Sequence, residues 1–137
     1  MSRTLSNALR QTVIARARNC CEYCLYPQAA SFFAFEMEHI ISEKHGGATS
    51  SDNLALACPF CNRFKGTDLG SVDKVTQKLT PFFNPRVQKW NEHFALEGAL
   101  IQALSAEGRV TIAILRMNDP ERIAERARLL EANLFFD

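Results

Sequence analysis

The 137-residue sequence has no long apolar run and almost no net charge, and each absence narrows the class of protein. No stretch reaches the roughly 18 consecutive apolar residues of a membrane-spanning helix. The first residues, Met1-Ser2-Arg3-Thr4-Leu5-Ser6, lack the apolar centre of a secretory signal. Hydrophobic residues make up 47% of the chain, which is typical of a globular domain. We therefore expect a cytoplasmic protein without a membrane segment.

The formal charge of +1 does not mark the chain as a strongly basic nucleic-acid-binding protein. Four cysteine thiolates around one Zn²⁺ would add a net charge of −2, which brings the folded chain to about −1. Any affinity for phosphate must therefore come from local clusters of basic residues or from a bound cation.

Four of the five cysteines form two Cys-x-x-Cys pairs, Cys21/Cys24 and Cys58/Cys61. Each pair offers two sulfur ligands from one turn, and two such turns complete a tetrahedral zinc site. The 33 residues between the pairs exceed the roughly 15–20 of simple zinc ribbons, which leaves room for a hairpin with a working loop. Buried free thiols and a redox pair are the alternatives, but neither explains the second pair. Cys20 is expected to be a small buried residue, although its spacing to Cys24 also allows it to replace Cys21.

Local patterns predict two helices and two strands in the first half of the chain. Ser6 is a good N-cap for a helix that runs to about Arg18, with apolar residues at helical spacing. Alternating residues predict a strand over 32–40, and a second short strand is predicted over 54–57. A helix is expected over 59–66, because proline suits its first turn and glycine its end. Together these elements outline a ββα unit.

The second half of the chain carries weaker signals. A strand is predicted over 99–103, and residues 109–117 favour a helix, although their β-branched residues also suit a strand. Asp119 and Pro120 predict the start of a last helix, with an apolar stripe made of Ile123, Ala127, Leu130 and Leu134. Two phenylalanine pairs, Phe32-Phe33 and Phe82-Phe83, are expected in the core.

One group of polar residues has the chemistry that phosphodiester hydrolysis requires: a base for water, and stabilisation of the charge on phosphate and on the departing oxygen. His39 is the candidate base, because an ordinary histidine pKa of about 6.5 suits neutral pH. Glu38 and Asn62 offer oxygen atoms to a divalent cation, and Asn53 can bond the loop backbone or the histidine. Taken singly, a histidine or asparagine is more often structural.

The adjacent positions of Glu38 and His39 set a condition on this hypothesis. Side chains of successive residues in a regular strand point to opposite faces of the sheet. For both residues to serve one site, the strand must end or bulge at this point.

The motif residues follow one another in a characteristic order: Cys-x2-Cys, Glu38-His39-Ile40, Gly46-Gly47, Asn53-Leu54-x-Leu56-x-Cys58-x2-Cys61-Asn62-x2-Lys65-Gly66. This order resembles the HNH endonuclease family, and more closely its zinc-stapled bacterial branch, over about residues 10–70. The resemblance implies an α+β fold whose ββα-metal core, HNH or treble-clef-like, is stapled by the four-cysteine zinc site and flanked by N- and C-terminal helices. We expect one domain over 1–137, with a C-terminal extension from about residue 71.

By this resemblance, His39 matches the general base and Glu38 the metal ligand beside it. Asn53 matches the middle asparagine, which constrains the loop and the base, and Asn62 matches the last motif position. That position is histidine in some members, so this chain reads His-Asn-Asn, and its oxygen ligands suggest Mg²⁺ or Mn²⁺. The implied activity is a divalent-metal-dependent DNA endonuclease that leaves 5′-phosphate and 3′-hydroxyl ends.

Arg63 and Lys65 are the candidate phosphate contacts, and a solvated helix face is the alternative for each. DNA is the expected partner, RNA stays open as a substrate, and a homodimer stays open as an alternative to a monomer. Two rival interpretations remain. A zinc-dependent nucleic-acid-binding module without catalysis predicts salt-sensitive binding and no cleavage, whereas a purely structural zinc domain predicts no binding to nucleic acid.

Overall fold

The computed structural model describes residues 5–135 and combines helices with three two-stranded antiparallel sheets. In chain order the strands are β1 (Glu36–His39), β2 (Leu54–Ala57), β3 (Gly70–Val72), β4 (Leu79–Pro81), β5 (Phe94–Glu97) and β6 (Leu100–Ala103). The α-helices are α1 (Asn7–Arg16), α2 (Pro59–Lys65), α3 (Trp90–His93), α4 (Ala106–Leu115) and α5 (Pro120–Glu131). The predicted α+β class with flanking helices is confirmed. Within the described residues, no helix has the length and apolar character needed to cross a membrane.

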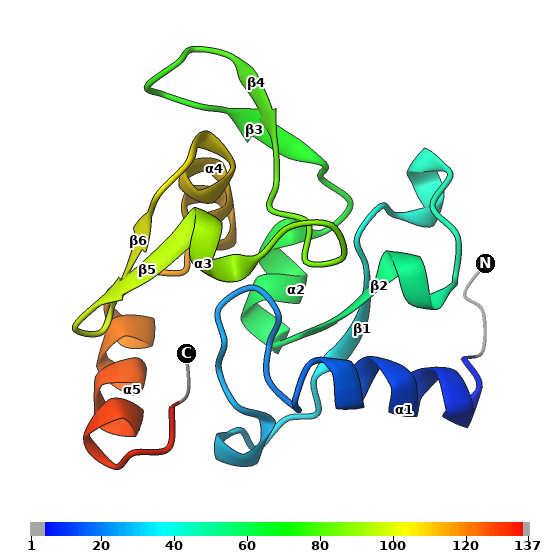
Figure 1. The fold of residues 1–137 in the computed structure, drawn as a ribbon, viewed down its shortest axis with the longest axis horizontal. Helices are drawn as coiled ribbons and strands as arrows, with labels where there is room; N and C mark the ends of the chain where they lie inside the picture. The colour runs from blue at the N-terminus through cyan, green and yellow to red at the C-terminus, as the bar shows by residue number, and fades with distance from the viewer. Residues whose placement is uncertain (1–4, 136–137) are drawn as a thin grey trace.

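The β1–β2 hairpin and α2 form the predicted ββα unit (Figure 1). The strands pair in a regular register that ends with His39 opposite Leu54, and all four residues of β2 are buried. Helix α2 packs on both strands. It begins as predicted, with Cys58 as N-cap and Pro59 in the first turn, and it ends at Gly66. Gly66 has a φ of 52°, a left-handed conformation that favours glycine.

Helix α1 begins at its predicted cap, where the Ser6 hydroxyl accepts the Leu9 N–H at 3.1 Å. It ends at Arg16, two residues earlier than predicted, because Arg18 and Asn19 both take positive φ values and turn the chain toward the first cysteine pair. The helix packs against β2 through buried Val13.

The outer edge of β2, which pairs with no strand, is covered by side chains and by the first cysteine turn. Arg16 donates from Nη2 to the Leu54 carbonyl at 2.9 Å. Glu22 contacts Leu56 twice: its carboxylate accepts the Leu56 N–H at 2.8 Å, and its own N–H donates to the Leu56 carbonyl at 2.8 Å. Arg86 forms an ion pair with the same Glu22 carboxylate. Three backbone groups on the outer edge of β2 are therefore paired within the chain.

The segment before β1 differs from the prediction, because the strand covers only Glu36–His39 of the expected 32–40. The side chain of Gln28 explains the difference: it donates to the Phe33 carbonyl at 2.9 Å and accepts the Phe35 N–H at 2.7 Å. The Phe33 carbonyl and the Phe35 N–H are therefore not available to pair with another strand. Phe32 and Phe33 are exposed, which corrects their expected place in the core, whereas Phe82 and Phe83 are buried as predicted.

The C-terminal extension contains two hairpins that the sequence did not reveal in full. The predicted strand over 99–103 is confirmed as β6, and the predicted helix over 109–117 as α4, but β3, β4 and β5 were missed. The β3–β4 hairpin projects from the rest of the chain at the top of Figure 1. A cluster of aromatic rings lies within the extension: Phe94 contacts Phe83 edge-on and Trp90 at a tilt, with ring centroids 5.2 and 5.1 Å apart. Trp90 also donates from its indole N–H to the Tyr23 carbonyl at 2.8 Å.

Helix α5 starts at Pro120 as predicted, but its buried face is not the expected apolar stripe. The buried residues of the helix are Leu129 and Arg126, while Leu134 beyond it is exposed. The guanidinium of Arg126 donates to the carbonyls of Ala99 at 2.6 Å and Met117 at 2.7 Å. The carbonyls of Ala99 and Met117 thus satisfy this buried cation. Of the predicted stripe, Ile123, Ala127 and Leu130 are half-buried.

The β3–β4 hairpin is anchored to α4 by an ion pair between Asp73 and Arg109, with N–O distances of 2.8 and 3.0 Å. This hydrogen-bonded pairing with Arg109 holds the pKa of the Asp73 carboxyl well below its usual range. Because the folded-state pKa is depressed, the anchor is fully present above the ordinary aspartate pKa of about 3.9 and weakens as pH falls below it.

Replacement of the buried anchor, Asp73→Asn, should loosen the hairpin, because the amide cannot form the bidentate ion pair with Arg109. Limited trypsin digestion should then cut faster at Lys74 and Lys78. Asp68→Asn removes an exposed carboxylate nearby and is the control. Equal digestion rates in the two variants would contradict the anchoring role.

Candidate metal centre and catalytic site

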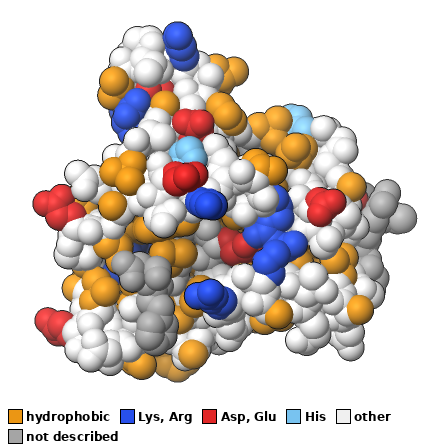
Figure 2. Space-filling model, viewed as in Figure 1, with side chains coloured by type: hydrophobic (Ala, Val, Ile, Leu, Met, Phe, Trp, Pro, Cys, Tyr) orange, Lys and Arg blue, Asp and Glu red, His pale blue; other side chains and the backbone are white. Residues whose placement is uncertain are grey.

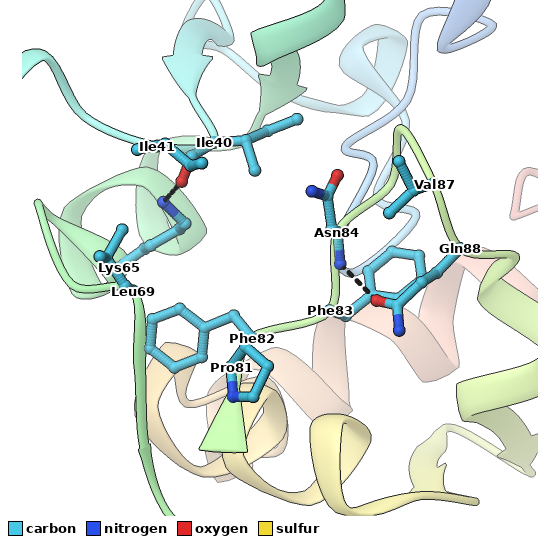
Figure 3. A pocket seen from close by; sticks show the side chains of 10 residues that line it. All are labelled: Ile40, Ile41, Lys65, Leu69, Pro81, Phe82, Phe83, Asn84, Val87 and Gln88. Carbon is cyan, nitrogen blue, oxygen red and sulfur yellow. Dashed lines mark hydrogen bonds between the residues drawn. The ribbon is translucent and has the colours of Figure 1, made fainter. Parts of the chain in front are cut away.

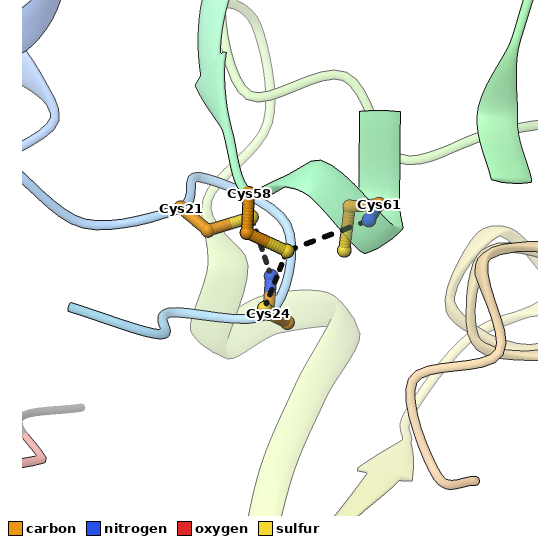
Figure 4. Close-up of side chains that lie close together, drawn as sticks. All are labelled: Cys21, Cys24, Cys58 and Cys61. Atoms are coloured by element: carbon orange, nitrogen blue, oxygen red, sulfur yellow. Dashed lines mark hydrogen bonds between the residues drawn. The ribbon is translucent and has the colours of Figure 1, made fainter. Parts of the chain in front are cut away.

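The four cysteines of the two pairs converge on one point (Figure 4). Their sulfur atoms all lie within 4.8 Å of one another, and the Cys24 and Cys58 sulfurs are 3.7 Å apart. Zn–S bonds of about 2.3 Å in a tetrahedron place sulfurs about 3.8 Å apart, so the donor set and its spacing fit a structural zinc ion. All four residues are buried. The predicted four-cysteine site is confirmed.

Each cysteine turn is shaped by hydrogen bonds to its own sulfur. The Cys24 N–H points to the Cys21 sulfur at 3.5 Å, and the Cys61 N–H points to the Cys58 sulfur at 3.4 Å. Cys20 stays outside the cluster, with its thiol 3.4 Å from the Arg18 carbonyl. Cys21 is therefore the ligand of the first pair, as preferred from the sequence.

Arg122, at the start of α5, contacts the sulfur cluster from the C-terminal extension. Its Nη2 lies 3.1 Å from the Cys61 sulfur and 3.8 Å from the Cys58 sulfur. Burial disfavours its charged form, yet the thiolates of Cys61, Cys24 and Cys58 raise the pKa of Arg122 above its ordinary value. No local pattern predicts this contact, because Arg122 is 61 positions from Cys61.

Removal of zinc should unfold the region around the two turns, because a structural zinc contributes folding free energy directly. A loss of about 5 kcal/mol lowers the melting temperature of a chain of this size by roughly 15–25 °C. Differential scanning calorimetry after zinc chelation measures this shift.

A matched pair of variants distinguishes a zinc ligand from a neighbouring cysteine that does not bind zinc. Cys24→Ser should lose zinc in native mass spectrometry, whereas Cys20→Ser should retain one ion per chain. A melting curve unaffected by complete zinc removal, or zinc loss from Cys20→Ser alone, would contradict the four-cysteine assignment.

His39 is the last residue of β1, and its imidazole faces the loop between the two strands. Its Nε2 lies 2.9 Å from the Thr49 hydroxyl, and the ring is half-buried. Within residues 5–135, Nδ1 has no hydrogen-bond partner. One ring nitrogen is therefore held by the loop, and the other is available for a proton.

Asn53 braces the loop that carries Thr49. Its side-chain oxygen accepts the Ile41 N–H at 2.9 Å, and its amide nitrogen donates to the carbonyls of Ile41 and Ala48 at 2.8 Å each. Of the two partners expected for Asn53, it binds the loop backbone. Gly47 is also required here, because a Cβ at this position would lie 1.7 Å from the Ile41 carbonyl oxygen.

Glu38 lies on the opposite face of β1 from His39, in a buried cluster with Tyr23 and Lys65. Only 4% of its surface is exposed. One carboxylate oxygen accepts the Tyr23 hydroxyl at 2.7 Å, and the other is 2.5 Å from the Lys65 ammonium. Burial raises the pKa of Glu38, while the charge and hydrogen bond of Lys65 act in the opposite direction. The pKa of Tyr23 is also raised, by burial first and then by Glu38.

Lys65 completes this cluster from the last turn of α2. It is 2% exposed, and its ammonium donates to the carbonyls of Ile40 at 2.8 Å and His39 at 3.3 Å. The group is thus occupied inside the protein, against our expectation of a phosphate contact. Lys65 instead fastens α2 to the end of β1, directly behind the backbone of His39.

The expected cation ligands, Glu38 and Asn62, are not brought into contact in this structure. Both oxygens of Glu38 have partners, whereas the half-exposed Asn62 side chain has none among residues 5–135. The oxygen donors suit Mg²⁺ in kind, but Glu38 does not fit as a direct ligand in this arrangement. The strand condition explains why: β1 is regular up to His39, so the two side chains leave on opposite faces.

Arg63, next to Asn62, is exposed on α2 with its guanidinium 5.2 Å from the centre of the Phe64 ring. A cleft of about 330 Å³ opens beside Ile40 and Ile41, and the loop after β4 forms its opposite wall (Figure 3). The lining includes Lys65, Asn84 and Gln88 but no carboxylate, so this cleft offers no anionic ligand to a cation. Acidic and basic side chains are mixed over the face in Figure 2, in agreement with the small net charge.

Replacement of Lys65 by methionine should strongly destabilise the protein, because the carboxylate of Glu38 would be left buried without its cation. Breaking such a pair costs about 3–5 kcal/mol. Urea unfolding followed by circular dichroism measures the loss. The double variant Lys65→Met/Glu38→Gln removes both charges and should recover part of the stability. Equal stability of Lys65→Met and the unaltered protein would contradict the buried ion pair.

Residues 21–68 match the model of the HNH endonuclease family, a segment that contains the four cysteines, Glu38, His39, Asn53 and Asn62. The resemblance predicted from the motif order is thus confirmed over this segment, which is about a third of the chain. Searches of curated proteins and of solved structures found no match to the chain.

Proposed function

We propose that this chain is a divalent-metal-dependent endonuclease that hydrolyses DNA phosphodiester bonds and leaves 5′-phosphate and 3′-hydroxyl ends. The HNH match implies nucleic acid as the class of substrate. The observation that carries the proposal is the position of His39. It is the last residue of β1, and its imidazole contacts Thr49, which belongs to the loop braced by Asn53.

In the proposed mechanism, His39 is the general base. It takes a proton from the attacking water through the ring nitrogen that Thr49 does not hold, and the charged imidazole keeps this proton during attack on phosphorus. The Asn53-braced loop fixes the ring, so little reorganisation is needed as the reaction proceeds. The bond to the 3′ oxygen breaks, the departing oxygen takes a proton from solvent water to become the 3′-hydroxyl, and the phosphate stays on the 5′ end.

A divalent cation, Mg²⁺ or Mn²⁺, would stabilise the charge on the phosphate and on the departing oxygen. Asn62 is the oxygen donor that supports this role, because its half-exposed side chain has no partner among residues 5–135. Glu38 would act as the acidic ligand only by exchanging Lys65 and Tyr23 for the cation.

Arg63 is the proposed phosphate contact, since it is exposed one residue after Asn62. A reducing, cytoplasmic setting would keep the five free cysteines unoxidised. One observation favours a second candidate function, a nucleic-acid-binding module without catalysis: the carboxylate of Glu38 is already occupied.

His39→Ala should abolish nicking of supercoiled plasmid DNA in Mg²⁺ or Mn²⁺, because general-base catalysis contributes about 10²–10⁴-fold to the rate. His45→Ala is the matched control, since His45 is exposed in the same loop region. Removal of the divalent cation alone should stop nicking and leave the melting curve unchanged. Equal nicking by the His39→Ala and unaltered proteins would overturn the assignment of the base. Salt-sensitive DNA binding without cleavage in either cation would favour the binding module.

A further inference from the structure

A single guanidinium joins the zinc centre to the C-terminal extension. The Nη2 of Arg122 contacts the Cys61 and Cys58 sulfurs, while its Nη1 donates to the carbonyls of Leu115 at 2.6 Å and Arg116 at 3.0 Å. The guanidinium also lies 5.6 Å from the centre of the Phe60 ring, in the turn between the two cysteines. From the start of α5, Arg122 therefore contacts both the second cysteine turn and the end of α4.

This contact is stabilising because the zinc centre carries a net negative charge. Four thiolates around Zn²⁺ carry a net charge of −2, and here the sulfurs are buried. A cation that donates hydrogen bonds to the sulfurs offsets half of that charge and stabilises the deprotonated ligands. Partners of this kind, outside the ligand shell, typically change metal affinity by 10–100-fold.

The other cations of α5 do not contact the zinc-site sulfurs, so the contact is specific to Arg122. Arg126 donates to the carbonyls of Ala99 and Met117, and Arg128 forms an exposed ion pair with Glu125. Among the described residues, no other side-chain cation donates a hydrogen bond to the zinc-site sulfurs. The N-terminal turn of α5 is thus tied directly to the metal ligands.

We propose that Arg122 is part of the zinc centre, and that it couples zinc binding to the docking of α5. The coupling is reciprocal: docked α5 raises zinc affinity, and bound zinc holds α5 in place by the same free energy. The C-terminal extension then has a defined role, which is to complete the zinc site assembled by the HNH segment. This inference does not depend on nuclease activity.

Zinc affinity of the full chain, measured by competition with a chromogenic chelator, tests the proposal. Arg122→Gln should weaken zinc binding by about 10–100-fold. Arg128→Gln removes the same charge from an exposed site on the same helix and should leave the affinity unchanged. Arg122→Lys keeps the charge but cannot reach both sulfurs and both carbonyls, so an intermediate loss is expected.

A spectroscopic measurement separates the sulfur contact from general loss of stability. With Co²⁺ in place of zinc, the bands of a tetrahedral site should persist in Arg122→Gln, while the sulfur-to-cobalt charge-transfer band should shift as the N–H donor is lost. If Arg122→Gln fails to fold, the affinity and spectrum of Arg122→Lys decide the question. Unaltered zinc affinity in a folded Arg122 variant, or an equal loss in Arg128→Gln, would overturn the proposal.

Hydrogen exchange tests the reciprocal effect in the unaltered chain. Removal of zinc should increase amide exchange over 120–131 together with exchange at the cysteine turns. Continued protection of 120–131 after the cysteine turns have opened would show that α5 docks independently, and the coupling would be wrong.

Discussion

The convergence of four sulfur atoms within 4.8 Å is the constraint on which the remaining structure depends. It closes the chain between the two cysteine pairs into one loop, and the β1–β2 hairpin occupies that loop. The second pair also begins α2, because Cys58 is both a candidate ligand and the N-cap. The metal site therefore sets the relative placement of the hairpin and the helix. It thereby also sets the positions of the residues at their ends. Without the metal, the hairpin would have to position α2 through packing and the polar contacts of Lys65.

The residues between the sulfur atoms and the candidate base form a second, electrostatic layer. Tyr23, from the first cysteine turn, holds Glu38, and Glu38 holds Lys65. Lys65 then fixes the carbonyls of His39 and Ile40. Through this chain of contacts, the first cysteine turn, β1 and α2 support the backbone of His39 from inside. The imidazole itself is held from outside by the loop. Different residues therefore support the backbone of the base and hold its ring on the side that is open to substrate.

Local signals predicted α1, β2 and α2 well, because a Ser6 cap, a short apolar run and a Cys58-Pro59 start act within a few residues. The zinc ligands were also predicted, since their spacing is itself the signal. The Glu38–Lys65 pair and Arg122 were not, because their partners lie far apart in the sequence and both charges are ordinarily found on surfaces. The hairpins of the extension were missed for another reason: their strands are three or four residues long and half-exposed, so alternation is hard to recognise.

The covered edge of β2 has a consequence for how copies of this chain meet one another. A two-stranded hairpin ordinarily exposes backbone donors and acceptors that can recruit a strand from another molecule. Here Arg16 takes up the Leu54 carbonyl, and Glu22 takes up both backbone groups of Leu56, so a strand from another molecule cannot pair with these groups. Strand addition and edge-to-edge aggregation are thereby blocked beside the candidate catalytic residue. Association along the outer edge of β2 therefore has to use side chains, not backbone pairing.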